Sequence, residues 1–482
     1  MGRNAWRRVL GAAALALVGL LPSVPAAAAA PVPTAKYALA AFGYDQGWRT
    51  DKHLRTLADV TRDGKADVVA FGDDGVWTSI SLGGGNFAPP KYALSGYGYN
   101  SGWRNGEHQR WVTDITNDGY ADLVGIRSEG VWTSVGLGDG SFAPMRFVSG
   151  IFGSNGRPGP LVVLPGDANA DGRTDIYAFA NGRVDIALAS GGGGFATPYL
   201  ASTEFTTDRF DFNQFKLAQV GGDKRSDILS VRFNPSVAPM SSLARADGTY
   251  GASQVSATSP ESPVFRFADI TGDGYADAIR FGYDANTYTG RAVGGGTFGT
   301  FGVGVGHFGY DNGTGYGTSS SPSPALADVT NDGRADLVGF SSTGVVSAVA
   351  RGDGTFAPAR HVNADFGSGT GWTVAQHPRL LADVTGEGAA DVVGFGNKGV
   401  FVGLSDGAGG FGGAVVPSLR GLTYDEARTR LVSAGLKVGA VSGVETCTSV
   451  DRVLTSHPAA GTSVSVGAVV DLSIGKKPAV CP

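Results

Sequence analysis

The chain has 482 residues, and its 38 Lys and Arg against 43 Asp and Glu give a net charge of −5. This balance argues against a nucleic-acid partner, because proteins that bind the phosphate backbone carry clustered positive charge. The 77 glycines indicate many tight turns.

Residues 1–30 have the pattern of a secretory signal peptide. Arg3, Arg7 and Arg8 form a basic start, residues 9–21 are apolar, and residues 26–30 offer small cleavage positions. No later stretch approaches the roughly 20 apolar residues that a membrane span needs. We therefore expect a secreted, extracellular protein with no membrane span, exported by the general or the twin-arginine route.

A nine-residue acidic stretch recurs along most of the chain, as in residues 328–336, which read DVTNDGRAD. The other intact copies span residues 59–67, 114–122, 167–175, 269–277 and 383–391, and a degraded copy spans residues 219–227. Consecutive copies begin 50 to 59 residues apart, which indicates tandem repeats with loops of variable length.

Each repeat has the pattern of about four short strands. In residues 37–90, a short apolar run at 68–71 is followed by a turn at 72–75 and then by a stretch of alternating polarity. No such unit could bury both faces of its sheet alone. We therefore predict a mainly β fold, a seven-bladed β-propeller over residues 37–411, with a β-solenoid as the alternative.

The C-terminal part has a different pattern. After a linker at residues 412–415, residues 416–475 predict a small α+β domain, and residues 476–482 form a tail, as residues 31–36 form a linker before the first repeat. Thr423 and Glu426 have capping-box spacing for a helix, and strands are expected at 438–444, 453–455 and 469–474. Cys447 and Cys481 are expected to form a disulfide in an oxidising exterior.

The acidic stretches are candidate structural Ca²⁺ loops. Their first, third, fifth and ninth positions offer oxygen ligands, and the glycine at the sixth position lets the backbone turn sharply. The candidate ligands are Asp59, Thr61, Asp63, Asp67, Asp114, Thr116, Asp118, Asp122, Asp167, Asn169, Asp171, Asp175, Asp269, Thr271, Asp273, Asp277, Asp328, Thr330, Asp332, Asp336, Asp383, Thr385, Glu387 and Asp391. The loop from Asp167 is the best of them, and no metal is expected at the degraded copy. The alternative is that these side chains cap backbone amides in Asx-type turns without a metal.

A second pattern marks only the first, second and seventh repeats, which are neighbours once a ring closes. It combines Gly-Trp, His-x-Arg and a later strand aromatic, and aromatic rings beside such donors can hold a sugar between blades. The candidate sugar-binding residues are Trp48, His53, Arg55, Trp77, Trp103, His108, Arg110, Trp132, Trp372, His377 and Arg379. The alternative is that they only pack the blades together.

Catalysis finds little support in the sequence. The stretch at residues 403–407 reads GLSDG, but other repeats have an ordinary hairpin turn at this place. We therefore do not expect an enzyme.

The repeats resemble known families. The pattern Asp-Val-Thr-x-Asp-Gly-x-Ala-Asp followed by Val-Val-Gly-Phe-Gly is similar to FG-GAP (VCBS-type) repeats, the Ca²⁺-binding units of integrin-α-like propellers. With Phe-Gly-x-x-x-Gly-Trp and His-x-Arg, the fuller pattern resembles the Psathyrella velutina lectin family. This resemblance implies recognition of N-acetylglucosamine-type glycans between blades, at the residues given above, in repeats one, two and seven.

The C-terminal stretch is similar to a PASTA domain, on the motifs at residues 416–421, 434–438, 457–461 and 469–472. That resemblance implies association with peptidoglycan or the cell wall. The sequence as a whole favours a Ca²⁺-stabilised, carbohydrate-binding propeller with a cell-wall module. The alternative is an integrin-like scaffold whose propeller binds another protein.

Overall fold

The computed structural model describes residues 32–153, 162–180, 182–205, 215–232, 237–258, 264–310, 316, 322–464 and 467–479. The expected signal peptide and Cys481 lie outside these ranges, so the leader and the Cys447–Cys481 disulfide stay predictions. Within the same ranges, no helix is long and apolar enough to cross a membrane.

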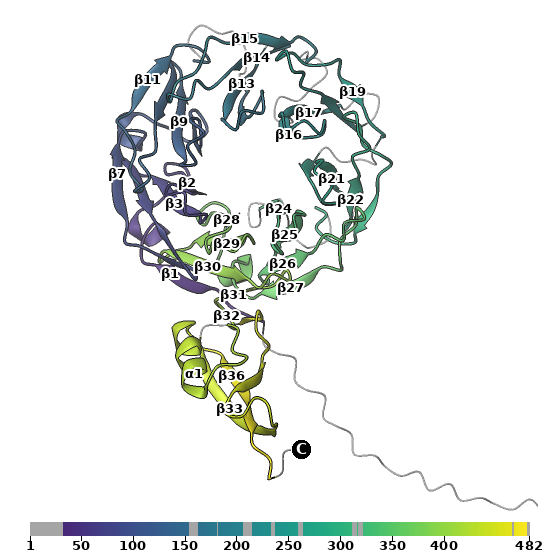
Figure 1. Cartoon of the computed structure of the whole chain (residues 1–482). Helices are drawn as coiled ribbons and strands as arrows, with labels where there is room; N and C mark the ends of the chain where they lie inside the picture. Colours follow the sequence, from purple (N-terminus) through teal and green to yellow (C-terminus); the bar gives the residue numbers. More distant parts are fainter. Residues whose placement is uncertain are drawn as a thin grey trace, which may run out of the picture. The chain divides into compact units, whose positions relative to one another are not determined.

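Seven antiparallel sheets of four paired strands follow one another in a ring, as Figure 1 shows. Within each of the first three sheets, neighbouring strands pair in chain order. The first sheet contains β2 (Arg55–Ala58), β3 (Asp67–Phe71), β4 (Gly75–Ser79) and β7 (Lys91–Ser95), and the second contains β8 (Gln109–Thr113), β9 (Asp122–Arg127), β10 (Gly130–Ser134) and β11 (Arg146–Ser149). The third contains β12 (Val162–Gly166), β13 (Asp175–Ala180), β14 (Arg183–Ala187) and β15 (Tyr199–Ser202).

The other four sheets have the same antiparallel order. They are β16 (Lys216–Ala218), β17 (Asp227–Arg232), β18 (Ala238–Ser242) and β19 (Gln254–Val255); β20 (Phe265–Ala268), β21 (Asp277–Phe281), β22 (Thr287–Gly290) and β23 (Gly302–Val305); β24 (Ala325–Ala327), β25 (Asp336–Phe340), β26 (Val345–Ala348) and β27 (Arg360–Asn363); β28 (Arg379–Ala382), β29 (Asp391–Phe395), β30 (Val400–Ser405) and β1 (Lys36–Leu39). Short pairs add β5 (Ser81–Gly83) to β6 (Asn86–Phe87) and β31 (Phe411–Gly412) to β30. The fold is therefore a seven-bladed β-propeller, as predicted.

The second strand of each blade carries the core. Every residue of β3 is buried, and so is every residue of β21, β25 and β29. These strands are short apolar runs because both of their faces pack against neighbouring blades, whereas the outer strand β7 is largely exposed. The acidic loops join the first strand of each blade to this buried second strand.

The last blade is completed by the start of the chain. Strand β1 pairs antiparallel with β30, with Tyr37 opposite Phe401 and Lys36 opposite Val402. A blade is thus offset from the sequence repeat by one strand, because the first strand of the 37–90 unit belongs to the seventh blade. This exchange closes the ring and covers an edge that would otherwise stay open.

A ring of backbone hydrogen bonds also joins the acidic loops. The eighth-position amide of each loop donates to the first-position carbonyl of the preceding loop, at 2.7 to 3.0 Å. The seven donor–acceptor pairs are Ala66–Asp383, Ala121–Asp59, Thr174–Asp114, Ser226–Asp167, Ala276–Gln219, Ala335–Asp269 and Ala390–Asp328. Because the series returns to its start, the units form a closed ring rather than an open solenoid.

The C-terminal part has its own small core. It contains β32 (Ala414–Val415), α1 (Tyr424–Ser433), β33 (Lys437–Glu445), β34 (Val453–His457), β35 (Ser463–Val464) and β36 (Val469–Lys476). Thr423 caps α1 and forms the expected capping box with Glu426, while Ala427 and Leu431 are buried. The stretch expected to be a linker, residues 412–415, instead contains the end of β31 and all of β32, which pairs with β35.

Candidate functional site

A loop between blades positions the aromatic side chains of the marked repeats. After the outer strand, the chain forms a short 3-10 helix in each of them: η1 (Tyr44–Gln46), η2 (Tyr99–Ser101) and η4 (Ser368–Thr370). In η1 the amides of Tyr44 and Asp45 donate to the carbonyls of Gly396 and Asn397 in the seventh blade, at 3.0 and 2.9 Å. The loop is thereby fixed to one blade while Trp48 faces the next.

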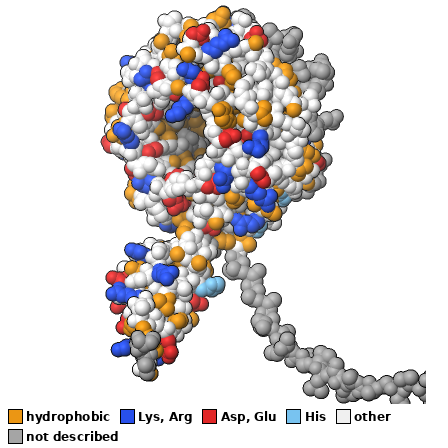
Figure 2. All heavy atoms as spheres, turned by 45° about the vertical axis from the view of Figure 1, so that its right-hand side comes forward, with side chains coloured by type: hydrophobic (Ala, Val, Ile, Leu, Met, Phe, Trp, Pro, Cys, Tyr) orange, Lys and Arg blue, Asp and Glu red, His pale blue; other side chains and the backbone are white. Residues whose placement is uncertain are grey.

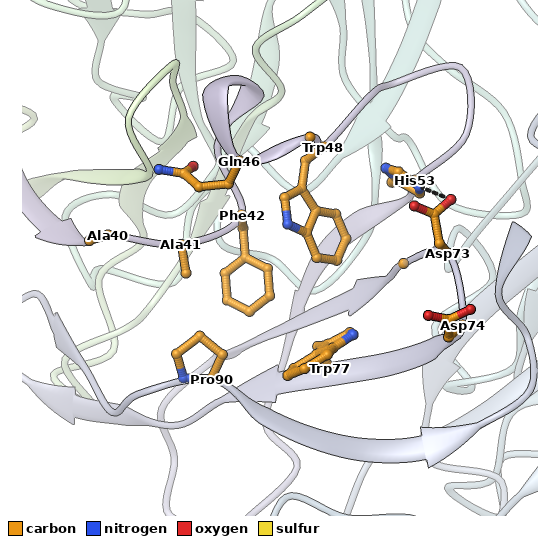
Figure 3. Close-up of a pocket in the computed structure, with 12 residues that line it drawn as sticks. Ala40, Ala41, Phe42, Gln46, Trp48, His53, Asp73, Asp74, Trp77 and Pro90 are labelled. Atoms are coloured by element: carbon orange, nitrogen blue, oxygen red, sulfur yellow. Dashed lines mark hydrogen bonds and ion pairs between the residues drawn. The ribbon is translucent and has the colours of Figure 1, made fainter.

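In the first repeat this loop encloses an open pocket of about 370 Å³. Its apolar walls are Phe42, Trp48, Trp77 and Pro90, whose rings surround the space in Figure 3. Its polar groups are Gln46, His53, Asp73 and Asp74. Three of the candidate sugar-binding residues, Trp48, His53 and Trp77, therefore lie together.

His53 is held on both ring nitrogens. Its Nδ1 accepts a hydrogen bond from the Arg49 amide at 3.0 Å, and its Nε2 lies 3.1 Å from Oδ1 of Asp73. Burial lowers the pKa of His53, although the hydrogen bond to Asp73 works in the opposite direction. The neutral imidazole thus carries its proton on Nε2 and donates it to Asp73, whose carboxylate remains half exposed at the pocket mouth.

The arginines of the His-x-Arg pattern face away from this pocket. Arg55, Arg110 and Arg379 are buried, and each donates from Nη1 to a backbone carbonyl, that of Phe42 at 3.0 Å in the case of Arg55. Phe42 has a φ of 64°, a conformation that a bulky residue adopts only when its surroundings hold it there. Burial lowers the pKa of each of the three arginines to about 10. These side chains hold the pocket loop rather than line the pocket.

The second repeat fills the corresponding space. Arg127 stands where the first repeat has Gly72, and its guanidinium carbon lies 5.2 Å from the ring centre of Trp103. Trp103 is fully buried, whereas Trp48 is only partly buried. A side chain on Gly72 would begin 3.3 Å from Trp48 and 3.4 Å from Trp77, so a larger residue at this position would narrow the first pocket.

The seventh repeat keeps a glycine, Gly396, but its Trp372 is more deeply buried than Trp48. The ring centres of Trp372 and Phe401 are 5.7 Å apart, and Trp372 is buried. His377 has the same arrangement as His53, with Asn397 in place of Asp73 at 2.8 Å. In the second repeat, Nδ1 of His108 accepts a hydrogen bond from the Arg104 amide, and Trp132 packs against Phe147. The three marked repeats are thus built alike but are not equivalent in shape or charge.

The ninth-position aspartates of the acidic loops are structural anchors. Asp67 accepts the Val60 amide on one oxygen and the Ser81 amide on the other, and equivalent bonds recur in all seven repeats, including Asp227 of the degraded loop. Burial raises the pKa of these carboxyls, to about 6 for Asp67, about 7 for Asp175 and about 8 for Asp391. A cation beside them would reverse that shift.

The loops differ in how free their fifth-position carboxylates are. In the first repeat Lys65 pairs with Asp63 at 2.5 Å, in the third Arg173 pairs with Asp171 at 2.6 Å, and in the sixth Arg334 pairs with Asp332. The loops of repeats two, five and seven have Tyr120, Tyr275 and Ala389 at this basic position. In the described part of the chain, no three His, Cys, Asp or Glu side chains converge as a metal site. Oxygen atoms of the first, third and ninth positions do lie close together, since the Thr61 hydroxyl is 3.3 Å from one oxygen each of Asp59 and Asp67, and oxygens are the ligands that a hard cation prefers.

Several residues of the pocket were not among the sequence candidates. These are Ala40, Ala41, Phe42, Gln46, Gly47, Gly72, Asp73, Asp74 and Pro90. Aligning the repeats on their acidic loops would have pointed to one of them, since positions 72, 127 and 396 read Gly, Arg and Gly.

Comparison with known proteins gives matches for both parts. Residues 114–178 match the FG-GAP-like repeat, and residues 414–476 match the PASTA domain. A solved Agrocybe aegerita lectin that specifically recognises non-reducing terminal N-acetylglucosamine is 34% identical, over 78% of this chain and 82% of its own, with a TM-score of 0.46. The Tc holotoxin pore of Photorhabdus luminescens is 15% identical, over 73% of this chain and 16% of its own, with a TM-score of 0.44. No protein with a curated description matches the chain.

Proposed function

The chain belongs to the same family as the Agrocybe aegerita lectin, with which it shares 34% identity over 82% of that protein's length, and from this premise we propose that it is a carbohydrate-binding protein. The observation that carries the proposal is the first-repeat pocket. Its Trp48 and Trp77 rings offer faces for the apolar side of a sugar, and the exposed carboxylates of Asp73 and Asp74 offer hydrogen-bond acceptors at the edge. The proposal assigns no catalytic role to this pocket.

The test is a glycan array probed with the wild-type protein and with Gly72→Arg. That substitution reproduces the residue that the second repeat already carries at the same position, so the fold should tolerate it. Val303→Arg adds the same charge on an exposed outer strand of the fifth blade and serves as the control. We expect glycan binding by the wild type and the control, and its loss in Gly72→Arg.

Failure of the folded wild type to bind any glycan would contradict the proposal. It would favour the alternative of a protein-binding scaffold. A protein partner whose binding survives competition by free sugar and the Gly72→Arg substitution would support that alternative directly.

We further propose that Ca²⁺ stabilises the propeller. The ion would be held by side-chain oxygens at the first, third, fifth and ninth loop positions, in the order Asp114, Thr116, Asp118 and Asp122 for the second repeat. Repeats two, five and seven are favoured over the Asp167 loop that the sequence ranked best, because Arg173 pairs with Asp171 there, whereas these three loops have no basic residue at the seventh position. Titration of the metal-free protein with Ca²⁺ tests this, and a Lys65→Ala variant should gain affinity at the first loop if its ion pair competes.

The PASTA domain supports a proposal of cell-wall association, and the leader pattern supports export. Sedimentation with insoluble peptidoglycan tests the first, by comparing the full chain with one that ends at residue 413. Binding that is equal in both would contradict a role for the C-terminal part.

A further inference from the structure

In the second repeat, the Arg127 side chain occupies the space that corresponds to the first-repeat pocket. The Arg127 side chain contacts the residues that correspond to the lining of the first-repeat pocket. Its Nη1 donates to the Ser101 carbonyl at 3.2 Å, its guanidinium lies 5.2 Å from the centre of the Trp103 ring, and its Nε is 3.2 Å from Oε1 of Glu129. The site is therefore filled by a cation that faces an aromatic ring and pairs with a carboxylate.

The first repeat keeps these partners but lacks the cation. In sequence register, Ser101, Trp103 and Glu129 correspond to Gln46, Trp48 and Asp74, all of which line the open pocket. Gly72 replaces the arginine, and Asp73 adds a second carboxylate where the second repeat has Ser128. Both charged residues of the pocket wall are acidic, and both are exposed toward its mouth.

Basic groups near the pocket have other contacts. The Lys52 ammonium lies over the Tyr99 ring at 4.9 Å, and Arg49 donates to the carbonyls of Tyr44 and Trp48. Arg55 is buried against the preceding blade. None of these three lines the pocket, so its aromatic faces and its carboxylates together favour a positively charged ligand group.

We propose that the first-repeat pocket selects an amino sugar whose amine is free and protonated, with the ammonium taking the place that the Arg127 guanidinium holds in the second repeat. This inference rests on the proposed carbohydrate-binding function and specifies the ligand class. A pyranose ring fits the four apolar walls better than a bare side-chain ammonium does, because Phe42, Trp48, Trp77 and Pro90 offer ring faces around the charge. In the seventh repeat Asn397 and Lys398 replace the two carboxylates, so selection for a cation belongs to the first pocket.

The test compares two probes of equal length by isothermal titration calorimetry, a fully deacetylated glucosamine oligomer and an N-acetylglucosamine oligomer, at a pH where the free amine is protonated. We expect the wild type to bind the deacetylated oligomer about tenfold more tightly. The double variant Asp73→Asn with Asp74→Asn should lose most of this preference, and Gly72→Arg should bind neither probe. The control Asp247→Asn with Asp353→Asn removes two exposed carboxylates from other turns and should keep the preference.

The outcomes separate the two proposals. Equal or tighter binding of the acetylated oligomer would overturn the inference and leave the carbohydrate-binding function standing. Preference unchanged in the Asp73 and Asp74 double variant would also overturn it. If neither oligomer binds, the inference fails, and failure on the glycan array as well would remove the proposed function. Binding of a lysine-rich peptide in place of both oligomers would overturn the sugar class.

Discussion

Gly72 and Arg127 occupy the same position in consecutive repeats, and the side chain there separates an open pocket from a filled one. The Arg127 guanidinium covers the face of Trp103, which is fully buried, while the corresponding Trp48 borders a cavity of about 370 Å³. Figure 2 shows acidic and basic side chains interspersed on one face of the molecule. The seventh repeat keeps a glycine at this position, Gly396, yet Trp372 is buried, so copies of one site in a repeat protein differ in shape through more than one residue.

The first prediction concerns Arg127→Gly. Removing the guanidinium leaves the Trp103 ring uncovered beside Glu129, so we expect a second binding site to open. Calorimetry should show a higher number of bound ligands per chain, and acrylamide should quench tryptophan fluorescence more strongly. The exchange variant Gly72→Arg with Arg127→Gly should restore the wild-type stoichiometry. If Arg127→Gly folds but changes neither the stoichiometry nor the quenching, the second repeat is closed by more than this residue.

The second prediction concerns the buried arginines. Arg110 donates to the Tyr97 carbonyl at 2.9 Å, and its guanidinium carbon lies 5.2 Å from the Phe71 ring of the preceding blade. We expect Arg110→Ala to lower the free energy of unfolding by about 2–3 kcal/mol, because a charge-assisted hydrogen bond and blade packing are lost together. Thermal unfolding measures this, with the exposed Arg245→Ala as the control. A ligand-binding defect without loss of stability would instead place Arg110 in a binding site.

Much of the propeller could be predicted from the sequence, because its determinants are local. The period of the acidic loops, the apolar second strands and the hairpin turns recur within each unit, and together they specify the blade. Ring closure by β1 could not be read in the same way. Its partners, residues 400–402, lie at the far end of the ring, and no local pattern shows which strand completes the last blade.

The site was predictable where side chains alone define it. Trp48, His53 and Trp77 were expected and do line the pocket. Arg55 was placed with them because a polar group beside aromatic rings resembles a ligand contact, yet its partner is the Phe42 carbonyl, a backbone group that no sequence pattern displays. Gly72 was missed for the opposite reason, since its contribution is an absent side chain.

The third prediction concerns closure of the ring. Deleting residues 32–39 removes β1 and leaves β30 with an unpaired edge, and it also removes Leu39 and Ala38 from the apolar cluster that they join. We expect a loss of roughly 3 to 5 kcal/mol of stability together with concentration-dependent association through the open edge. Differential scanning calorimetry and light scattering measure the two effects. Val303→Arg, on the exposed outer strand β23 of another blade, should cause neither effect. An unchanged melting temperature without β1 would contradict closure by this strand.

The fourth prediction links pH and Ca²⁺ through the ninth-position aspartates. Burial raises the pKa of Asp175 to about 7 in the folded chain, whereas an unfolded aspartate has a value near 3.8. The folded state therefore binds the proton more tightly, so the stability from this group is full below about pH 4 and is lost as the pH rises through about 7. In EDTA, the melting temperature should fall across this interval, with Asp391 extending the fall toward pH 8.

Bound Ca²⁺ would replace the proton as the positive partner of these carboxylates. The ion favours the ionised form and lowers the pKa of Asp391, so saturating Ca²⁺ should raise the melting temperature near neutral pH and flatten its dependence on pH. At pH 5 the ion should have a smaller effect, because protons compete for the same oxygens. Burial also raises the pKa of Asp227, but this residue lies in the degraded loop, where no metal is expected. Its contribution to the pH dependence of the melting temperature should therefore remain in Ca²⁺. Identical pH profiles in EDTA and Ca²⁺ would show that the loops are Asx-type turns held by backbone amides alone.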